Sequence, residues 1–394
     1  MSSSLSRLPM EAAASPAPLF HRLANAVVDP AVFDYWVGLI NPLWRWAEPV
    51  ARVVDRRPAG GGAVTLTLQA NRHVGTFLPG QHVNVGAEIN GRLITRSYSL
   101  TGLPRADRRL EITVQPVQGG PMSTHLCEPA RVGDVLRVSP AFGDMVLPAP
   151  TAWAPGDRLV FLAAGSGITP FVGLARALAA QDMPVALDVI VWARSTEQLM
   201  RVDDLRALAT QHPRLRVQVV LTGPVRADVQ ACQPAPHGRL SAELLPKLLP
   251  EQSTEPGHAP ADWSTTTVLA CGPAGFVATA RTLLQPLART FHAEAFTPHV
   301  LADAPAADAP PVQVQLLRSG RTLSISPGEA LLLALEAQGI TPPSGCRMGI
   351  CRTCICTRVS GTTLASDTGE RDAEPGVPLR LCVSHACTDL SLDL

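Results

Sequence analysis

Six of the nine cysteines lie in the last 49 residues, and four of these six are spaced as ligands of an iron–sulfur cluster. Cys346, Cys351 and Cys354 form the pattern Cys-x4-Cys-x2-Cys, and Cys382 follows at a distance. Four thiolates in this spacing hold the two irons of a 2Fe–2S cluster. A structural zinc site is the alternative, but zinc usually takes paired short Cys-x2–4-Cys hooks. The spacing therefore predicts these four cysteines as metal ligands.

The other residues of this segment agree with that prediction. Gly345 and Gly349 allow the chain to wrap tightly and to turn backbone N–H groups toward the sulfur atoms. The two remaining cysteines, Cys356 and Cys387, are interpreted as core thiols, because the x4–x2 spacing selects Cys354 as the third ligand.

A second group of chemically capable residues is Arg96-Ser97-Tyr98-Ser99, at the end of a predicted strand. A guanidinium group can pair with a phosphate, and a tyrosine ring can pack on the face of a flavin and hydrogen-bond through its hydroxyl. A serine hydroxyl can donate to a ring nitrogen. Because side chains alternate along a strand, Arg96 and Tyr98 are expected on one face. Together these residues indicate a flavin nucleotide site.

Glycines before a short predicted helix at 123–128 indicate where a pyrophosphate would bind. In the run Gly119-Gly120-Pro121-Met122-Ser123, backbone N–H groups at the start of the helix can donate to an anion. This element favours FAD over FMN and makes Gly120, Met122 and Ser123 candidate contacts of the cofactor. The alternative is a β-barrel with ordinary turns.

A third candidate is the run Gly165-Ser166-Gly167-Ile168-Thr169-Pro170, which follows a continuous apolar stretch at 159–164. A buried strand, a glycine-rich turn and the start of a helix form a cradle for nucleotide phosphates. Thr169 is predicted as the helix N-cap and Pro170 as the first helical residue. Gly165, Gly167, Thr169 and Pro170 are therefore candidates for binding NAD(P)H.

The elements that must position these residues differ along the chain. Between 51 and 147, short alternating runs are separated by Gly, Pro, Asn and Asp, which predicts an antiparallel barrel or sandwich. From 158 to 296, continuous apolar runs alternate with helical patterns, which predicts a parallel α/β sheet. Beyond a Pro/Ala/Asp stretch, 312–317 and 322–325 predict a hairpin, and 328–338 predicts a helix.

Composition excludes several classes of protein. The 394 residues include 33 basic and 33 acidic side chains, so the net charge is zero and no basic stripe for nucleic acid stands out. A hydrophobic content of 46% is too high for wholesale disorder, and nine cysteines are too few for a disulfide scaffold. The sequence shows neither an apolar signal-peptide core at its start nor an apolar run of ~18 residues, so a cytoplasmic, reducing setting is expected.

Together, these motifs resemble a known superfamily. Arg96-Ser97-Tyr98-Ser99 and the glycine-rich run at 165–170 resemble the flavin and nicotinamide modules of the ferredoxin–NADP reductases. Pro343-Ser344-Gly345-Cys346 and Leu381-Cys382-Val383-Ser384 resemble plant-type ferredoxins. The order of the modules is that of the oxygenase-reductase branch, the phthalate dioxygenase reductase arrangement, over residues 51–394.

The resemblance implies a multi-domain fold. Its parts are an N-terminal extension (1–50), an antiparallel β-barrel domain for FAD (51–150), a parallel-sheet α/β domain for NAD(P)H (156–299), a linker (300–311) and an α+β domain of β-grasp type for the 2Fe–2S cluster (312–394). The linker is predicted from its composition.

The resemblance also assigns roles in the nicotinamide module. In the family, the cysteine of Cys271-Gly272-Pro273 lies beside the nicotinamide and helps to position the ring; a buried inert thiol is the alternative. Glu294-Ala295-Phe296 resembles the Glu-x-Phe sequence that approaches the flavin edge. Catalytic roles are therefore expected for Ser99, Cys271 and Glu294, and cofactor contacts for Gly272, Pro273 and Phe296.

Two further residues bear on the choice between NADH and NADPH. Arg194 and Ser195 follow the apolar run at 186–191, at the position where the family handles the adenosine ribose. Both would bind the 2′-phosphate of NADPH; a solvated surface arginine is the alternative. The sequence leaves the choice of nicotinamide open.

The N-terminal extension has an unusual concentration of aromatic residues. Phe33, Tyr35, Trp36, Trp44 and Trp46 lie within 14 residues, and a proline after Asn41 interrupts any helix. The segment either packs across a domain interface or contacts a membrane surface or a membrane-bound acceptor. It resembles the leader of reductases that serve membrane desaturases and hydroxylases, which implies a position at the inner face of the membrane.

The expected function is an NAD(P)H-dependent reductase. It takes hydride onto flavin and passes single electrons through the cluster to a separate oxygenase, hydroxylase or fatty-acid desaturase, while the protein supplies placement and electrostatics. Two alternatives stay open: a self-sufficient oxidoreductase, and a cluster-based redox sensor without turnover.

Overall fold

The computed structural model describes residues 29–148, 153–224, 236–249, 262–296 and 310–394. The chain divides into two compact units, residues 1–48 and 49–394. The predicted linker at 300–311 lies mostly outside the described residues. None of the helices in the described part of the chain is long and apolar enough to cross a membrane.

In the first unit, the described residues form one short helix, α2 (Pro30–Ile40). Asp29 caps its start by accepting from the Ala31 N–H at 2.7 Å. The helix ends before Asn41-Pro42, as the proline predicted. Asp34 fixes the segment that follows by accepting from the Trp46 N–H at 2.6 Å. The helix has no buried residue.

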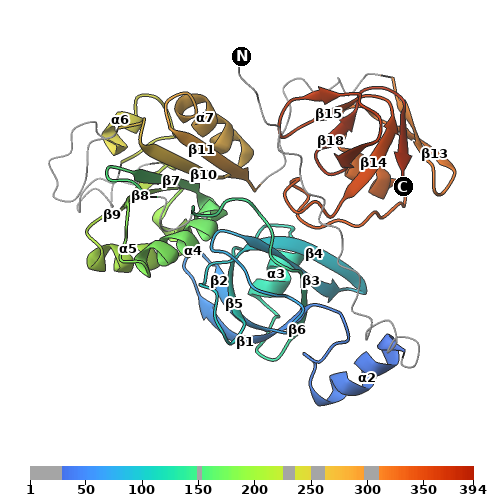
Figure 1. Cartoon of the computed structure of the whole chain (residues 1–394), viewed down its shortest axis with the longest axis horizontal. Coiled ribbons are helices and arrows are strands. Elements are labelled where there is room, and N and C mark those ends of the chain that lie inside the picture. Colours follow the sequence, from blue (N-terminus) through green and yellow to red (C-terminus); the bar gives the residue numbers. More distant parts are fainter. Residues whose placement is uncertain (1–28, 149–152, 225–235, 250–261, 297–309) are drawn as a thin grey trace. The chain divides into compact units, whose positions relative to one another are not determined.

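The second unit begins with a six-stranded antiparallel sheet in the order β4-β3-β6-β1-β2-β5 (Figure 1). Its strands are β1 (Val50–Pro58), β2 (Val64–Ala70), β3 (His82–Ile89), β4 (Arg92–Ser99), β5 (Arg109–Val114) and β6 (Val135–Val138), and the helix α3 (Pro121–Cys127) precedes β6. A bridge between Leu100 and Ile112 joins the two edge strands, so the sheet closes on itself. The predicted barrel is confirmed.

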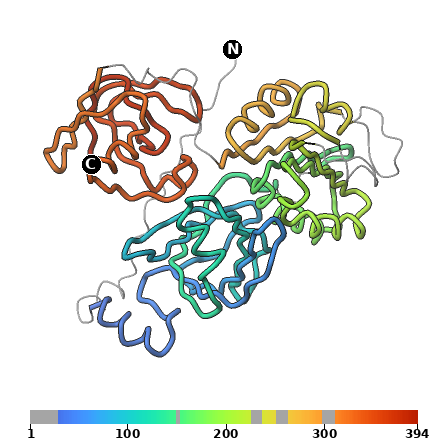
Figure 2. The backbone as a smooth tube through the Cα atoms, turned by 180° about the vertical axis from the view of Figure 1, so that it is seen from behind, coloured from blue at the N-terminus to red at the C-terminus, as the bar shows by residue number. Residues whose placement is uncertain are grey.

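The middle of the unit is a five-stranded parallel sheet in the order β11-β10-β7-β8-β9 (Figure 1). Figure 2 shows the backbone of this part, green to yellow, from behind. Its strands are β7 (Arg158–Ala164), β8 (Ala186–Ala193), β9 (Leu215–Leu221), β10 (Thr266–Gly272) and β11 (Thr290–Ala295), with helices α4 (Ile168–Ala179), α5 (Val202–Gln211), α6 (Leu245–Leu248) and α7 (Ala274–Leu284). Alternate residues of β7 face two separate cores: Phe161 belongs to one and Leu162 to the other. The strand order reverses between β7 and β10, where open α/β sheets bind ligands.

The C-terminal part is a mixed sheet in the order β13-β12-β19-β14-β17 with a second sheet β16-β15-β18. Its elements are β12 (Val312–Leu316), β13 (Arg321–Ile325), α8 (Leu331–Ala337), β14 (Ile355–Ser360), β15 (Thr363–Ala365), β16 (Arg371–Asp372), β17 (Val377–Arg380), β18 (Ser384–Ala386) and β19 (Leu390–Asp393). Leu331 and Leu335 of α8 pack in the core with Val314 and Leu392 of the larger sheet. The predicted hairpin, helix and β-grasp architecture are confirmed.

Candidate functional site

A cavity of about 360 Å³ lies beside the end of β4 and the start of α3. The sequence-predicted residues that line it are Arg96, Tyr98, Ser99, Gly120, Met122, Ser123, Thr169 and Phe296. They come from the barrel with its helix α3, from the start of α4 and from the residue after β11, so three distant stretches of sequence meet here. The cavity also contains residues that the sequence did not single out, among them His82 and Arg347.

The cavity fits an anionic aromatic cofactor. Arg96 is half-buried, and its pKa is lowered by burial and then by the nearby Arg347 guanidinium, so two cations lie close together where a phosphate would neutralise them. Arg347 is itself held by Glu336, which accepts from its Nη1 and Nη2 at 2.8 and 2.7 Å. Burial raises the pKa of Tyr98, so its hydroxyl stays protonated and available as a donor.

The turn after β7 forms the predicted nucleotide cradle, with one correction. Gly165 adopts a positive φ of 56°, and an added Cβ there would meet no atom within 4 Å, which leaves its backbone open to a ligand. The turn runs directly into α4, so Gly167 rather than Thr169 is the N-cap. Pro170 is the third helical residue, where its missing N–H costs nothing. The hydroxyl of Thr169 instead lies 3.0 Å from that of Ser99 in the barrel.

Gly167 and Cys271 belong to neighbouring strand ends and lie in close contact. A Cβ added at Gly167 would lie 2.0 Å from the Cys271 carbonyl oxygen, so only glycine lets the turn approach β10. Cys271 is fully buried, and burial, followed by the charge of Glu294, raises its thiol pKa well above the ordinary value. The thiol is therefore neutral and suited to packing rather than to nucleophilic chemistry. Gly272 accepts from the Phe296 N–H at 2.9 Å, and Pro273 caps α7.

Glu294 lies next to a residue that the sequence did not assign. Its Oε2 atom is 3.2 Å from Nε2 of His82, and the two side chains are 9% and 2% exposed. Burial lowers the pKa of His82 to about 4 and raises that of Glu294 to about 8. Between these pH values both groups are uncharged, so the pair is not an ion pair. Phe142 stacks on His82 and Phe296 meets it edge-on, each at 6.0 Å between ring centroids.

Replacing Glu294 with Gln is expected to remove an alkaline limb from the pH profile of flavin reduction. Because the Glu294 pKa is about 8, the wild-type side chain gains a negative charge as the pH rises past 8. That charge would oppose arrival of a hydride, so the single-turnover rate with NAD(P)H should fall several-fold from pH 7 to 9. The glutamine variant should have a flat profile over this range. An unchanged alkaline limb in the variant would assign it to another group.

Arg194 and Ser195 follow β8, away from the residues that line the flavin cavity. The Arg194 side chain is exposed, and its carbonyl oxygen accepts from the Gly223 N–H at 2.9 Å, which brings the ends of β8 and β9 together. His237 lies beside the Gly223 carbonyl oxygen. The structure therefore places Arg194 at the carboxyl edge of the sheet, with its side chain exposed among the residues that the structure describes.

The four predicted ligand cysteines are brought together by a tight loop. Backbone N–H groups point at their sulfur atoms: Met348 and Cys351 donate to Cys346 Sγ at 3.3 Å, and Gly349 donates to Cys382 Sγ at 3.2 Å. Hydrogen bonds from the Cys351 and Cys382 thiols, with those of the backbone, lower the pKa of Cys346 and favour its thiolate.

The donor set of this loop fits the cluster. Cys354 is also buried and its sulfur is hydrogen-bonded to the Cys382 thiol, whereas burial raises the pKa of Cys356 to about 12. Within the described ranges, no three His, Cys, Asp or Glu side chains are arranged to bind a single metal ion. A 2Fe–2S cluster instead divides four thiolates between two irons.

The cysteine loop also borders the flavin cavity. Cys346, Arg347 and Met348 are among its lining residues. Asn84 of β3 packs so closely on Gly345 that an added Cβ would lie 2.7 Å from its Nδ2 atom. These contacts have no local sequence signal, because they join residues more than 250 positions apart. Nothing in the sequence paired His82 with Glu294, which lies more than 200 positions away.

Comparison with known proteins assigns each part to a family. Residues 62–146 match the oxidoreductase FAD-binding domain, 161–282 the oxidoreductase NAD-binding domain, and 314–387 the 2Fe-2S iron-sulfur cluster binding domain. These matches support a class of protein that combines a flavin, a nicotinamide nucleotide and a 2Fe–2S cluster.

Relatives that match most of the chain define this class more closely. An NADPH oxidoreductase of Mycobacterium tuberculosis is 31% identical over 98% of this chain and 96% of its own. The ferredoxin reductase component of 3-ketosteroid-9-alpha-monooxygenase, from the same species, is 33% identical over 72% of this chain and 75% of its own. The solved structure of phthalate dioxygenase reductase has the same fold, with a TM-score of 0.55, 22% identity, and coverage of 88% of this chain and 97% of that one. The chain belongs to the oxygenase-reductase branch of the ferredoxin–NADP reductase superfamily.

Proposed function

We propose that this protein supplies electrons, one at a time, to a separate oxygenase, hydroxylase or membrane-bound desaturase. The observation that carries the proposal is that one and the same cavity is bordered by Tyr98 and Ser99 of the barrel, Thr169 of α4 and Cys346 of the cluster loop. When bound, the flavin converts a hydride into two single electrons and the cluster carries one at a time. The predicted domain boundaries at 51–150, 156–299 and 312–394 are part of this proposal.

Each residue of the site then has a proposed role. Arg96 neutralises the FAD phosphates, Tyr98 packs on the ring, and Ser99 hydrogen-bonds near its reacting edge, with Gly120, Met122 and Ser123 along the pyrophosphate. Gly165, Gly167, Thr169 and Pro170 hold the nicotinamide nucleotide, and Cys271, Gly272 and Pro273 form the floor beside its ring. Glu294 and Phe296 close the flavin edge and exclude water. Cys346, Cys351, Cys354 and Cys382 hold the irons.

The test is NAD(P)H oxidation by the purified protein with cytochrome c as sole acceptor. An electron-transfer component reduces such artificial acceptors and turns over no organic substrate alone. A self-sufficient oxidoreductase would instead oxidise a substrate without a partner. A redox sensor would show flavin and cluster absorption that NAD(P)H does not bleach.

NADPH is proposed as the preferred donor. The exposed Arg194 guanidinium and the Ser195 hydroxyl at the carboxyl edge of the sheet suit a 2′-phosphate. The mycobacterial relative that matches nearly the whole chain is named for NADPH. The ratio of kcat/KM values for NADPH and NADH decides the point.

We further propose that α2 contacts the inner face of a membrane at which the acceptor resides. In α2 and the few residues after it, the large apolar side chains that are more than half exposed are Val32, Tyr35, Trp36, Leu39, Ile40 and Trp44. The only charged side chain within the helix is Asp34, which is engaged with the Trp46 N–H. Tryptophan and tyrosine on a short apolar helix are typical of an element that lies in the membrane interface.

Replacing Trp36 and Ile40 together with Ala is expected to lower the partition coefficient onto phospholipid vesicles by about tenfold or more, from the apolar area lost. Co-sedimentation with vesicles containing anionic lipid measures this. Reduction of ferricyanide by NAD(P)H should not change, since the flavin site lies in the other unit. The matched control is Leu287→Ala, a 52% exposed leucine outside the helix, which should partition like wild type. Equal partition of all three proteins would contradict membrane contact.

A further inference from the structure

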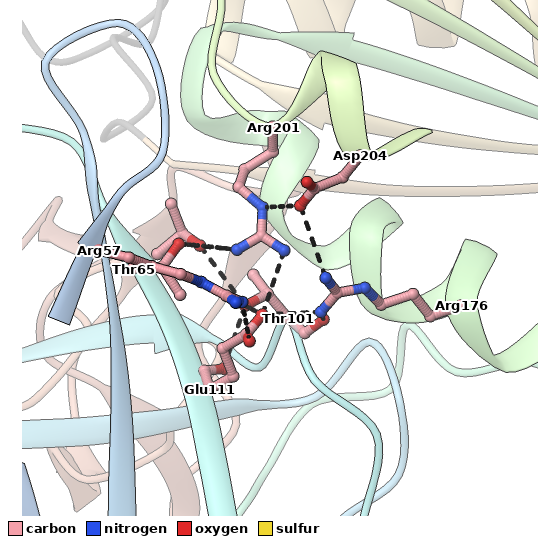
Figure 3. A network of polar contacts seen from close by, with 8 residues as sticks. Arg57, Thr65, Thr101, Glu111, Arg176, Arg201 and Asp204 are labelled. Atoms are coloured by element: carbon pink, nitrogen blue, oxygen red, sulfur yellow. Dashed lines mark hydrogen bonds and ion pairs between the residues drawn. The ribbon is translucent and has the colours of Figure 1, made fainter. Parts of the chain in front are cut away.

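A buried charged network joins the barrel to the helices of the nucleotide domain (Figure 3). At its centre is Glu111 of β5, whose side chain is 15% exposed. Its Oε1 atom accepts from Arg176 Nη1 at 2.7 Å, from Arg201 Nη2 at 3.1 Å and from the Thr101 hydroxyl at 3.0 Å. Arg57 pairs with its second oxygen. One carboxylate therefore binds groups from both domains.

Arg201 is the most constrained member of the network. Its side chain is 3% exposed, and its Nη1 atom donates to the hydroxyls of Thr65 at 2.7 Å and Thr113 at 3.1 Å, on barrel strands β2 and β5. Its φ of 59° is unfavourable for a residue with a side chain, so surrounding contacts must hold it there. Because Arg201 directly precedes α5, these contacts fix the start of that helix on the barrel.

The network contains three guanidinium groups, those of Arg57, Arg176 and Arg201, and two carboxylates, those of Glu111 and Asp204. Asp204 lies 2.6 Å from Arg201 Nε and 3.5 Å from Arg176 Nη2, but it is 43% exposed and lies at the edge. Burial alone would raise the pKa of Glu111, yet the guanidinium groups of Arg176 and Arg201 outweigh burial and lower it. At neutral pH Glu111 is therefore a carboxylate, and no other anion reaches the buried side of Arg201 in the part of the network that the structure describes.

The same helix that carries Arg176 also carries the contact to the flavin site. At the start of α4, the Thr169 hydroxyl lies 3.0 Å from that of Ser99. One turn later, a Cβ added at Gly173 would lie 2.6 Å from the Leu100 carbonyl oxygen. At the next turn, Arg176 Nη1 donates to the Thr101 carbonyl oxygen at 2.9 Å. Helix α4 is thus fixed along its length to Ser99 and the residues that directly follow it.

We propose that Glu111 is a positioning residue for hydride transfer. By binding Arg176 and Arg201 together, it holds α4 in register with the end of β4, and so sets the nucleotide cradle at Thr169 against the flavin edge at Ser99. The proposal rests on the proposed roles of Ser99 and Thr169. Glu111 does not touch either cofactor site; it acts through the helix. A small shift of α4 would change the distance between hydride donor and acceptor without removing any group that binds them.

The test is Glu111→Gln, which keeps the shape of the side chain and removes its charge. In stopped-flow reduction of the FAD-loaded protein, the limiting rate at saturating NAD(P)H should fall by about tenfold or more, as misplacement of reacting groups predicts. The nucleotide concentration at half-maximal rate and the FAD content should each change by less than a factor of about two, because the binding groups stay in place. The control is Asp203→Asn, an exposed carboxylate in the first turn of α5 that pairs with Arg206 outside the network, and this variant should behave as wild type.

Several outcomes separate this proposal from its alternatives. An unchanged limiting rate in E111Q overturns it, and so does a loss of rate that only follows a loss of bound FAD, which would mean a merely structural role. If E111Q does not fold, Arg176→Gln removes the link from α4 alone and should lower the limiting rate with normal FAD content; an unchanged rate there also overturns the proposal. If wild-type flavin is not reduced by NAD(P)H, the proposed function fails instead.

Discussion

Replacing Cys351 with Ser is expected to abolish the electron paramagnetic resonance signal of the reduced cluster and NAD(P)H-dependent reduction of cytochrome c. Mutation of a residue that hydrogen-bonds to a metal ligand lowers metal affinity by roughly 10–100-fold. Removal of a ligand itself is expected to lower the affinity further. The flavin cavity is lined by Cys346 but not by Cys351, so reduction of bound flavin by NAD(P)H should be unaffected. Flavin reduction reports on transfer from NAD(P)H to the flavin, and cytochrome c reduction reports on transfer through the cluster.

The matched control for this experiment is Cys356→Ser. Cys356 lies five residues after Cys351, on β14, and is buried in the core of the sheet with no contact to the sulfur-directed N–H groups. This variant should keep its cluster, with at most some loss of stability from burying a hydroxyl. If C356S loses the cluster signal and C351S keeps it, the assignment of ligands is wrong.

The second large effect is expected for Arg96→Ala, which should purify largely without FAD. Removing one partner of a desolvated charge pair costs about 2–5 kcal/mol, which corresponds to a loss of affinity of about 30-fold or more. Because Arg96 is half-buried and a second guanidinium group, that of Arg347, lies nearby, we expect the cavity to attract a phosphate. Absorbance at the flavin band relative to protein, and titration with added FAD, measure the loss.

Arg92→Ala provides the comparison, because Arg92 stands at the other end of the same strand and is exposed. It should retain a full complement of FAD. If R96A contains a full complement of FAD, Arg96 does not bind the phosphates of FAD. The neighbouring Arg347 would then be the candidate for that role.

The sequence predicted the parts of this protein whose signals are local. Alternation around Leu66 and Leu68 predicted the barrel, continuous runs such as 159–164 predicted the parallel sheet, and the spacing of Cys346, Cys351 and Cys354 predicted the metal loop. In each case, neighbours in sequence are neighbours in space, so periodicity and spacing are sufficient.

The features that the sequence did not predict depend on packing between distant elements. The start of α4 was placed two residues late because Thr169 looks like a cap, whereas its hydroxyl is directed to Ser99 across the domain boundary. The His82–Glu294 pair and the Glu111 network join residues that only the tertiary fold brings together. Arg201 could not be distinguished from an ordinary surface arginine, because its burial depends on the barrel beneath it.

The flavin cavity and the cysteine loop share a wall, and this affects how the protein transmits electrons. Tunnelling weakens exponentially with distance and does not depend on solvent viscosity. Since Cys346 borders the same cavity as Tyr98 and Phe296, a flavin held in that cavity would lie beside a residue proposed to hold the cluster. An electron would then pass between them over a short distance, without a domain movement through solvent. Diffusion would limit the arrival of the nucleotide and the encounter with the external acceptor.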